Sequence, residues 1–78
     1  MTKKEKLIQQ LTSLPTDMRF SDVRKVLEWH GYELRRSSGS HFMFRKDGFP
    51  RLDIPKRDGK TVARAYLKMI ADALELKG

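Results

Sequence analysis

One histidine of this sequence stands in a setting suited to proton transfer. His41 follows Gly39 and Ser40 and opens the alternating run from Phe42 to Arg45. Histidine has an ordinary pKa of about 6.5, so it can both accept and release a proton near neutral pH. The pattern alone also leaves open that His41 is an ordinary surface residue on a solvated sheet face.

Basic and polar side chains around His41 are suited to binding phosphate. The candidate substrate-binding residues are Arg35, Ser40, Arg45, Arg51, Lys56, Arg57 and Lys60. RNA carries its own nucleophile, the 2′-hydroxyl, so cleavage needs removal of that proton, stabilisation of a phosphorane and protonation of the leaving oxygen. We therefore expect chemistry that uses no metal and no cofactor.

The composition favours a polyanionic partner. Seventeen Lys and Arg against ten Asp and Glu give a formal charge of +7 over 78 residues. A basic surface also suits an acidic protein or an anionic membrane, so charge does not separate these partners. The absence of cysteine excludes disulfides and thiolate zinc sites, and two histidines make a poor metal set.

The chain has the size of one domain, and nothing in it reads as a linker or an internal repeat. We expect residues 1–78 to form a single domain, with 1–19 as an accessory helix and connector. The first residues lack the apolar run of a signal peptide, and no stretch approaches the ~20 apolar residues of a membrane span. A cytoplasmic protein without membrane association is the expectation.

Two helices are predicted before the strands begin. The first covers residues 3–14, where apolar residues recur at helical spacing as far as Pro15: Leu7, Ile8, Leu11 and Leu14. We expect it to add to the core. Ser21 is the expected cap of the second helix, and Gly31 its left-handed end. His30 is expected to bond the last carbonyls of that helix, and Trp29 to pack.

Three strands and a helix follow. The strands are predicted over residues 32–35, 41–45 and 51–54, joined by loops at 37–40 and 46–49. Thr61 is the expected cap of the last helix, whose predicted apolar face is Val62, Ala65, Tyr66, Met69, Ile70, Ala73 and Leu74. The prediction is an α+β domain in the order α-α-β-β-β-α, with helices on one face of a three-stranded antiparallel sheet.

Alternation assigns the strand residues to two faces. The helix-facing set is Leu34, Phe42, Phe44, Leu52 and Ile54, and the opposite set is Arg35, His41, Met43, Arg45, Arg51 and Asp53. The expected pairs are Leu34 with Phe42, Arg35 with His41, Met43 with Asp53, Arg45 with Arg51, and His41 with Pro55. Lys56 and Arg57 would then lie close to the imidazole, and an anion over the sheet would relieve the repulsion of Arg45 and Arg51.

Residues 20–74 resemble the HicA, or YcfA-like, family of messenger-RNA interferase toxins. The resemblance rests on the opening from Phe20 to Val23, on Gly-Ser-His ending at His41, and on Ile54-Pro55 before the last helix. It implies a fold similar to the double-stranded RNA-binding domain, and His41 as catalytic residue. It also implies a HicB-like antitoxin partner and an mRNA substrate, with no DNA contact by this chain alone.

The sequence departs from the family at one point that bears on catalysis. Many relatives carry a second histidine after the proline that ends the third strand, whereas Pro55 is followed by Lys56, Arg57 and Asp58. Two other interpretations stay open. One is a non-catalytic RNA-binding module using basic residues around the start of the last helix, Arg64 among them. The other is a basic protein-interaction domain.

Overall fold

The computed structural model describes residues 2–76. Along the chain the elements are α1 (Lys3–Thr12), β1 (Asp17–Arg19), α2 (Phe20–Trp29), β2 (Glu33–Ser38), β3 (His41–Arg45), β4 (Leu52–Pro55), β5 (Thr61–Ala63) and α3 (Arg64–Ala73). The predicted order of three helices and three main strands is confirmed. The short strands β1 and β5, which pair with each other, were not predicted from the sequence.

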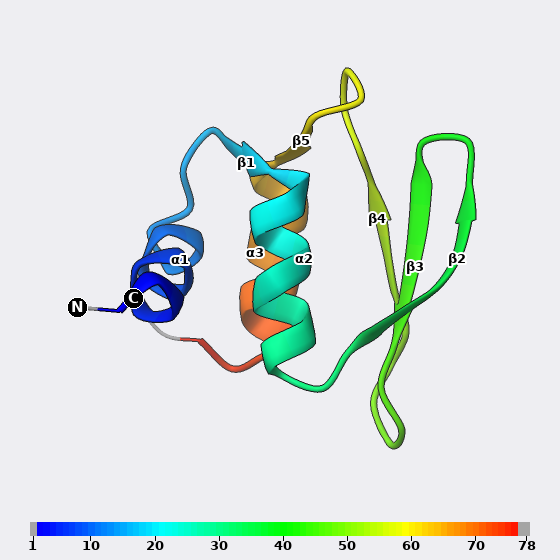
Figure 1. Cartoon of the computed structure of the whole chain (residues 1–78), viewed down its shortest axis with the longest axis horizontal. Helices are drawn as coiled ribbons and strands as arrows, with labels where there is room; N and C mark the ends of the chain where they lie inside the picture. Colours follow the sequence, from blue (N-terminus) through cyan, green and yellow to red (C-terminus); the bar gives the residue numbers. More distant parts are fainter. Residues whose placement is uncertain (1, 77–78) are drawn as a thin grey trace.

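The molecule is built in layers (Figure 1). The antiparallel sheet β2-β3-β4 lies on one side, α2 and α3 form the middle, and α1 packs on the far side of that helix pair. Helices therefore cover one face of the sheet and leave the other uncovered. We call the uncovered side the open face.

The core fills the space between the helices and the sheet. Phe44 and Ile54 supply the sheet's fully buried side chains, and Leu52 is almost as deeply buried. Leu34 and Phe42 pack against this cluster while partly exposed. The predicted helix-facing set of strand residues is therefore confirmed, and their alternate neighbours are directed to the open face.

Helix α1 contributes to the same core. Leu11 has no exposed surface, Leu7 retains 8% of its exposure, and Ile8 packs partly buried against the cluster. The helix begins with a capping box, in which the Thr2 hydroxyl accepts the Glu5 N–H at 3.1 Å. The expectation that this helix adds to the core is confirmed.

The predicted caps of the two later helices are wrong. Helix α2 begins at Phe20, before Ser21, and the Phe20 N–H donates to the Lys60 carbonyl at 2.9 Å. Helix α3 begins at Arg64, whose N–H donates to the Thr16 carbonyl at 3.1 Å, while Thr61 lies in β5. The pairing of β1 with β5 fixes where both helices start and brings a backbone carbonyl to the first N–H of each, and neither start has a side-chain cap.

The predicted apolar face of α3 is also wrong in part. Its buried residues are Leu67, Ile70 and Ala71. Tyr66 and Met69 remain 37% and 36% exposed. The helix starts two residues later than expected, after the β1–β5 ribbon, and turns Leu67 and Ala71 toward the core. Among the predicted residues, Ile70 and Val62 lie in the core, Val62 as part of β5, and Ala73 and Leu74 pack partly buried against it.

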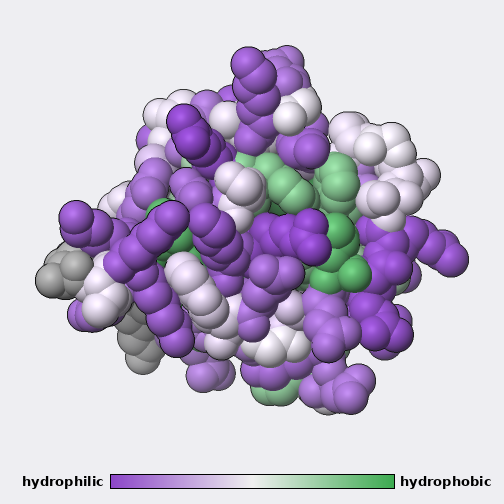
Figure 2. Space-filling model, viewed as in Figure 1, coloured by the Kyte–Doolittle hydropathy of each residue, from purple (hydrophilic) through white to green (hydrophobic). Residues whose placement is uncertain are grey.

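Hydrophilic residues cover most of the surface seen in Figure 2, and hydrophobic atoms show mainly in a strip between the helices and the sheet. None of the helices in the described part of the chain is both long and apolar enough to cross a membrane.

Replacing Leu11 with alanine tests whether α1 belongs to the cooperative core. Because Leu11 is fully buried, Leu11→Ala is expected to lower the free energy of unfolding by about 2–5 kcal/mol. Gln10→Ala, on the exposed side of the same helix, is the matched control and is expected to change it by less than about 0.5 kcal/mol. Urea unfolding followed by circular dichroism measures both. Equal stability of the two variants would mean that α1 is only loosely attached.

Candidate active site

His41 is the first residue of β3 and is exposed on the open face. It pairs with Pro55 of β4, as predicted, and on the other side with Ser38 of β2. Its neighbour Phe42 faces the helices, with its ring centroid 4.5 Å from that of Phe20. The backbone thus anchors His41 on both sides while its side chain is free to meet a large ligand.

A tight turn sets the position of His41. Ser38 pairs with His41, so the loop between them is only Gly39 and Ser40. Gly39 has φ 60°, which suits the first position of a type II′ turn. The Ser40 carbonyl accepts the Lys56 N–H at 2.7 Å and so ties the turn to the chain leaving β4. Ser40 therefore positions the hairpin end through its backbone.

The predicted register of the first hairpin is wrong. Leu34 pairs with Phe44 instead of Phe42, and the register shifts between Leu34 and Arg36. Arg35 is the extra residue of this β-bulge and does not lie opposite His41. The structure also assigns Ser37 and Ser38 to β2, although the sequence analysis placed them in the loop.

The bulge follows from a conflict between turn and strand. With a two-residue turn and no bulge, Leu34 would pair with Arg45 and so be directed to the open face. One inserted residue shifts the register by one, so that Leu34 pairs with Phe44 and is directed to the core. The Gly39-Ser40 pair, a known two-residue hairpin signal, was the feature of the sequence that could have predicted this.

Arg36 is the basic residue that sequence analysis missed. It pairs with Met43, which lies two residues from His41 on the open face. Ladder partners share a face, so Arg36 joins His41 there. The side chain is exposed and makes no ion pair among the described residues. Arg36 therefore takes the place beside the histidine that was expected for Arg35.

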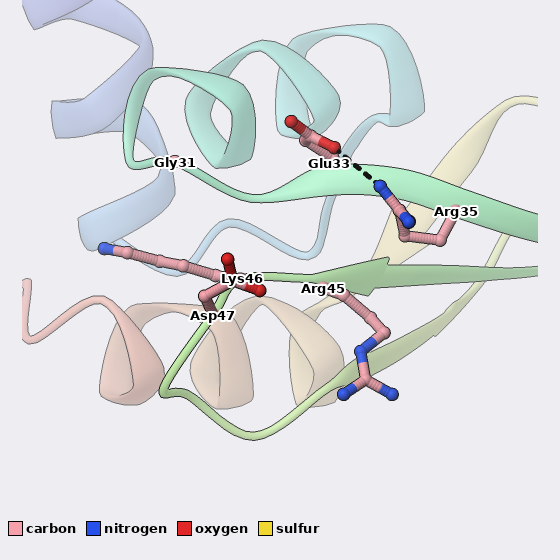
Figure 3. A pocket seen from close by; sticks show the side chains of 6 residues that line it. All are labelled: Gly31, Glu33, Arg35, Arg45, Lys46 and Asp47. Atoms are coloured by element: carbon pink, nitrogen blue, oxygen red, sulfur yellow. Dashed lines mark hydrogen bonds and ion pairs between the residues drawn. The ribbon is translucent and has the colours of Figure 1, made fainter.

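Arg35 belongs to a different part of the sheet. Its Nη1 lies 3.0 Å from Oε2 of Glu33, and both residues line a cavity of about 350 Å³ with Arg45, Lys46, Asp47 and Gly31 (Figure 3). In Figure 3 the Arg45 side chain extends away from this ion pair. The cavity carries acidic as well as basic groups, so its charge is partly balanced.

The expected crowding of Arg45 and Arg51 is relieved at Arg51 alone. The observed pair Met43–Asp53 confirms the predicted register of this hairpin, and the ladder runs on to Phe44–Leu52. Arg51 Nε lies 3.3 Å from Asp53 Oδ2, and Arg45 pairs across β2 with Glu33. A carboxylate therefore stands beside Arg51, whereas Glu33 forms its ion pair with Arg35 and leaves Arg45 without an ion pair among residues 2–76.

Lys56 and Arg57 do not surround the imidazole as expected. The Lys56 ammonium lies 4.9 Å from the ring centroid of Phe20 and 4.7 Å from that of Phe42, on the helix side of the sheet. Arg57 Nη2 lies 3.7 Å from Oδ2 of Asp17 in β1. Pro55 pairs with His41, so alternation directs Lys56 to the opposite face of the sheet. The ion pair with Asp17 of β1 holds the Arg57 side chain away from the imidazole.

Other polar groups have structural partners. His30 Nδ1 donates to the Val26 carbonyl at 2.8 Å, as expected for a histidine ending a helix. Burial raises the pKa of the Tyr32 hydroxyl, which donates to the Pro50 carbonyl at 3.3 Å. No group of three or more metal-ligating side chains occurs among residues 2–76.

Comparison with known protein families assigns the chain to a family. The family described as HicA toxin of bacterial toxin-antitoxin systems matches residues 20–76, which include α2, the whole main sheet and α3. The chain is thus a toxin component of the toxin-antitoxin class, and it belongs to the HicA toxin family. Neither a curated protein nor a solved structure matches it in the same comparisons.

The turn before His41 offers a test of this geometry. An added Cβ at Gly39 would meet no atom within 4 Å, so Gly39→Ala carries only the cost of its positive φ. We expect it to lower the free energy of unfolding by about 1–2 kcal/mol. A chain synthesised with D-alanine at this position is the matched control and is expected to keep wild-type stability. A stable L-alanine variant would contradict the assigned turn.

Proposed function

We propose that this HicA-family toxin is an endoribonuclease that cleaves messenger RNA, with His41 as its catalytic residue. The observation that carries the proposal is the exposed His41 at the start of β3, on a sheet face that none of the described helices covers. An extended RNA strand can lie on such a face, whereas an enclosed pocket would admit only a small molecule. The +7 charge supports a polyanionic substrate.

The chemistry begins from the substrate's own nucleophile. The 2′-oxygen loses its proton, forms a bond to phosphorus and displaces the 5′-oxygen of the next nucleotide, which takes up a proton. The products are a 2′,3′-cyclic phosphate and a 5′-hydroxyl. His41 transfers one of these protons, and water transfers the other. Neither a metal nor a cofactor takes part in this scheme.

Charge on the phosphorane is stabilised from the open face. Arg36 is the nearest candidate along the ladder, and Arg45 lies farther along the same strand as His41. Guanidinium groups suit phosphoryl oxygens because they donate paired N–H bonds. Of the residues expected from the sequence, Arg35, Arg51 and Arg57 are engaged by carboxylates, so we assign them secondary roles in holding the strand.

A modest rate is expected. The residues in the position of the second histidine of relatives face elsewhere, because Lys56 lies over two aromatic rings and Arg57 contacts Asp17. A single positioned acid or base contributes about 10²–10⁴-fold to the rate. Such an enzyme acts slowly, which is sufficient for a toxin that accumulates when its inhibitor is lost.

The partners follow from the same surface. A HicB-like antitoxin with an acidic face would suit the basic charge and block access to His41. We place the toxin, its mRNA substrate and this partner in the cytoplasm, and we assign the chain alone no role in DNA binding.

A second candidate function is RNA binding without cleavage. The His41 side chain makes no hydrogen bond to any described residue, so no protein group orients it for catalysis. Against this candidate, Arg64 is already occupied, since its Nε donates to the Pro15 carbonyl at 3.3 Å. Both functions require RNA affinity that falls with salt, and only the first gives cleaved products.

Replacing His41 distinguishes RNA cleavage from RNA binding without cleavage. His41→Ala is expected to abolish growth arrest and to lower RNA cleavage by at least about 10²-fold in the presence of a chelator. RNA affinity should change little. His30→Ala is the matched control, because it removes a structural hydrogen bond and leaves the open face intact. It should lose stability and keep cleavage. Toxicity that is equal in His41→Ala and wild type would end the enzyme proposal.

A further inference from the structure

A second basic site lies on the helix side of the turn that carries His41. An open cavity of about 460 Å³ is lined by Arg19, Phe20, Ser21, Lys56, Gly59 and Lys60. Half of these residues are basic, and none is acidic. The cavity is joined to the catalytic turn through the Lys56 N–H, which donates to the Ser40 carbonyl at 2.7 Å.

No ion pair among the described residues neutralises the positive charge of this cavity. The ion pairs among residues 2–76 engage Arg24, Arg35, Arg51, Arg57 and Lys68. Arg19, Lys56 and Lys60 are in none of them. The cavity of Figure 3 differs in this respect, since Glu33 and Asp47 line it together with its basic residues. The helix-side cavity is therefore the stronger site for an anion.

Lys56 is held in place before any ligand arrives. Its ammonium lies over the rings of both Phe20 and Phe42, whose centroids are themselves 4.5 Å apart. Contact with two aromatic faces restricts the side chain, so less conformational entropy remains to be lost on binding. The ammonium donates no hydrogen bond to a described residue, so its N–H groups are available to an anion.

We propose that this cavity binds a phosphodiester of the RNA strand that is cleaved at His41. The strand would pass over the Gly39-Ser40 turn, with the scissile phosphate on the open face and a neighbouring phosphate held by Lys56, Lys60 and Arg19. Guanidinium, ammonium and hydroxyl groups are the donors from which phosphate oxygens accept hydrogen bonds, and Arg19, the two lysines and Ser21 supply them here. The inference rests on the proposed function and assigns it a phosphate subsite outside the sheet.

The test measures binding in the His41→Ala background, so that cleavage does not enter. Lys56→Met and Lys60→Met remove charge and keep side-chain length. Lys3→Met, on the exposed side of α1, is the matched control with the same change in net charge. The affinity for a fluorescent single-stranded oligouridylate is measured by anisotropy over a series of salt concentrations. Thermal unfolding checks that each variant is folded, and Lys56→Arg supplies a charged variant at the packed position.

We expect each cavity variant to reduce the slope of log K against log salt by about 0.7, and Lys3→Met to leave it unchanged. Lys56→Arg should retain the slope. Slopes in both cavity variants equal to that of Lys3→Met would overturn the proposal, as would a complete lack of RNA binding. Loss of affinity for polyglutamate alone would also overturn it and assign the cavity to an acidic protein. Cleavage by the wild type together with unchanged slopes would leave the role of His41 standing.

Discussion

The geometry of the site depends on the register of the β2–β3 hairpin, which decides the face of the sheet toward which each side chain is directed. A two-residue turn at Gly39-Ser40 places His41 on the open face, but continued without interruption it would also turn Leu34 away from the core. Burying Leu34 beside Phe44 requires one extra residue, and the bulge at Arg35 supplies it. The two-residue turn itself sets Arg36 opposite Met43, on the face of the histidine, and the insertion at Arg35 leaves that arginine with Glu33. The length of the turn thus decides that Arg36 lies on the face of His41, and the packing of Leu34 decides where the extra residue stands.

Much of the fold was predictable because apolar periodicity reports burial directly. The strand β3, the helix-facing residues of the sheet and the register of His41 with Pro55 all follow from alternation. The β1–β5 ribbon was not predictable, since three-residue strands give no periodic signal and Met18 and Val62 meet only in the fold. The caps at Ser21 and Thr61 failed for the same reason, because the ribbon sets where each helix starts and distant carbonyls accept the first N–H of α2 and of α3.

The candidate site was predictable in part. His41 and its exposure could be inferred from the motif and from alternation, whereas the surroundings of the imidazole could not. Their arrangement depends on the length of the Gly39-Ser40 turn, on the inward turn of Lys56 over Phe20 and on the contact of Arg57 with Asp17. Ion pairs neutralise Arg35, Arg51 and Arg57 beside the sheet. The basic residues of the helix-side cavity have no such partners among the described residues. Under the function we propose, one proton-transfer group and two separate places for phosphate would hold a strand firmly and cleave it slowly.

The most direct test of the central claim uses an RNA with a single 2′-deoxynucleotide at the cleaved position. If His41 assists attack by the 2′-hydroxyl, the all-RNA substrate yields a 2′,3′-cyclic phosphate and a 5′-hydroxyl, and the substituted strand binds with similar affinity without being cut. Mass spectrometry of the products and gel analysis of both strands give the result. Cleavage of the substituted strand, or products ending in a 5′-phosphate, would contradict the account.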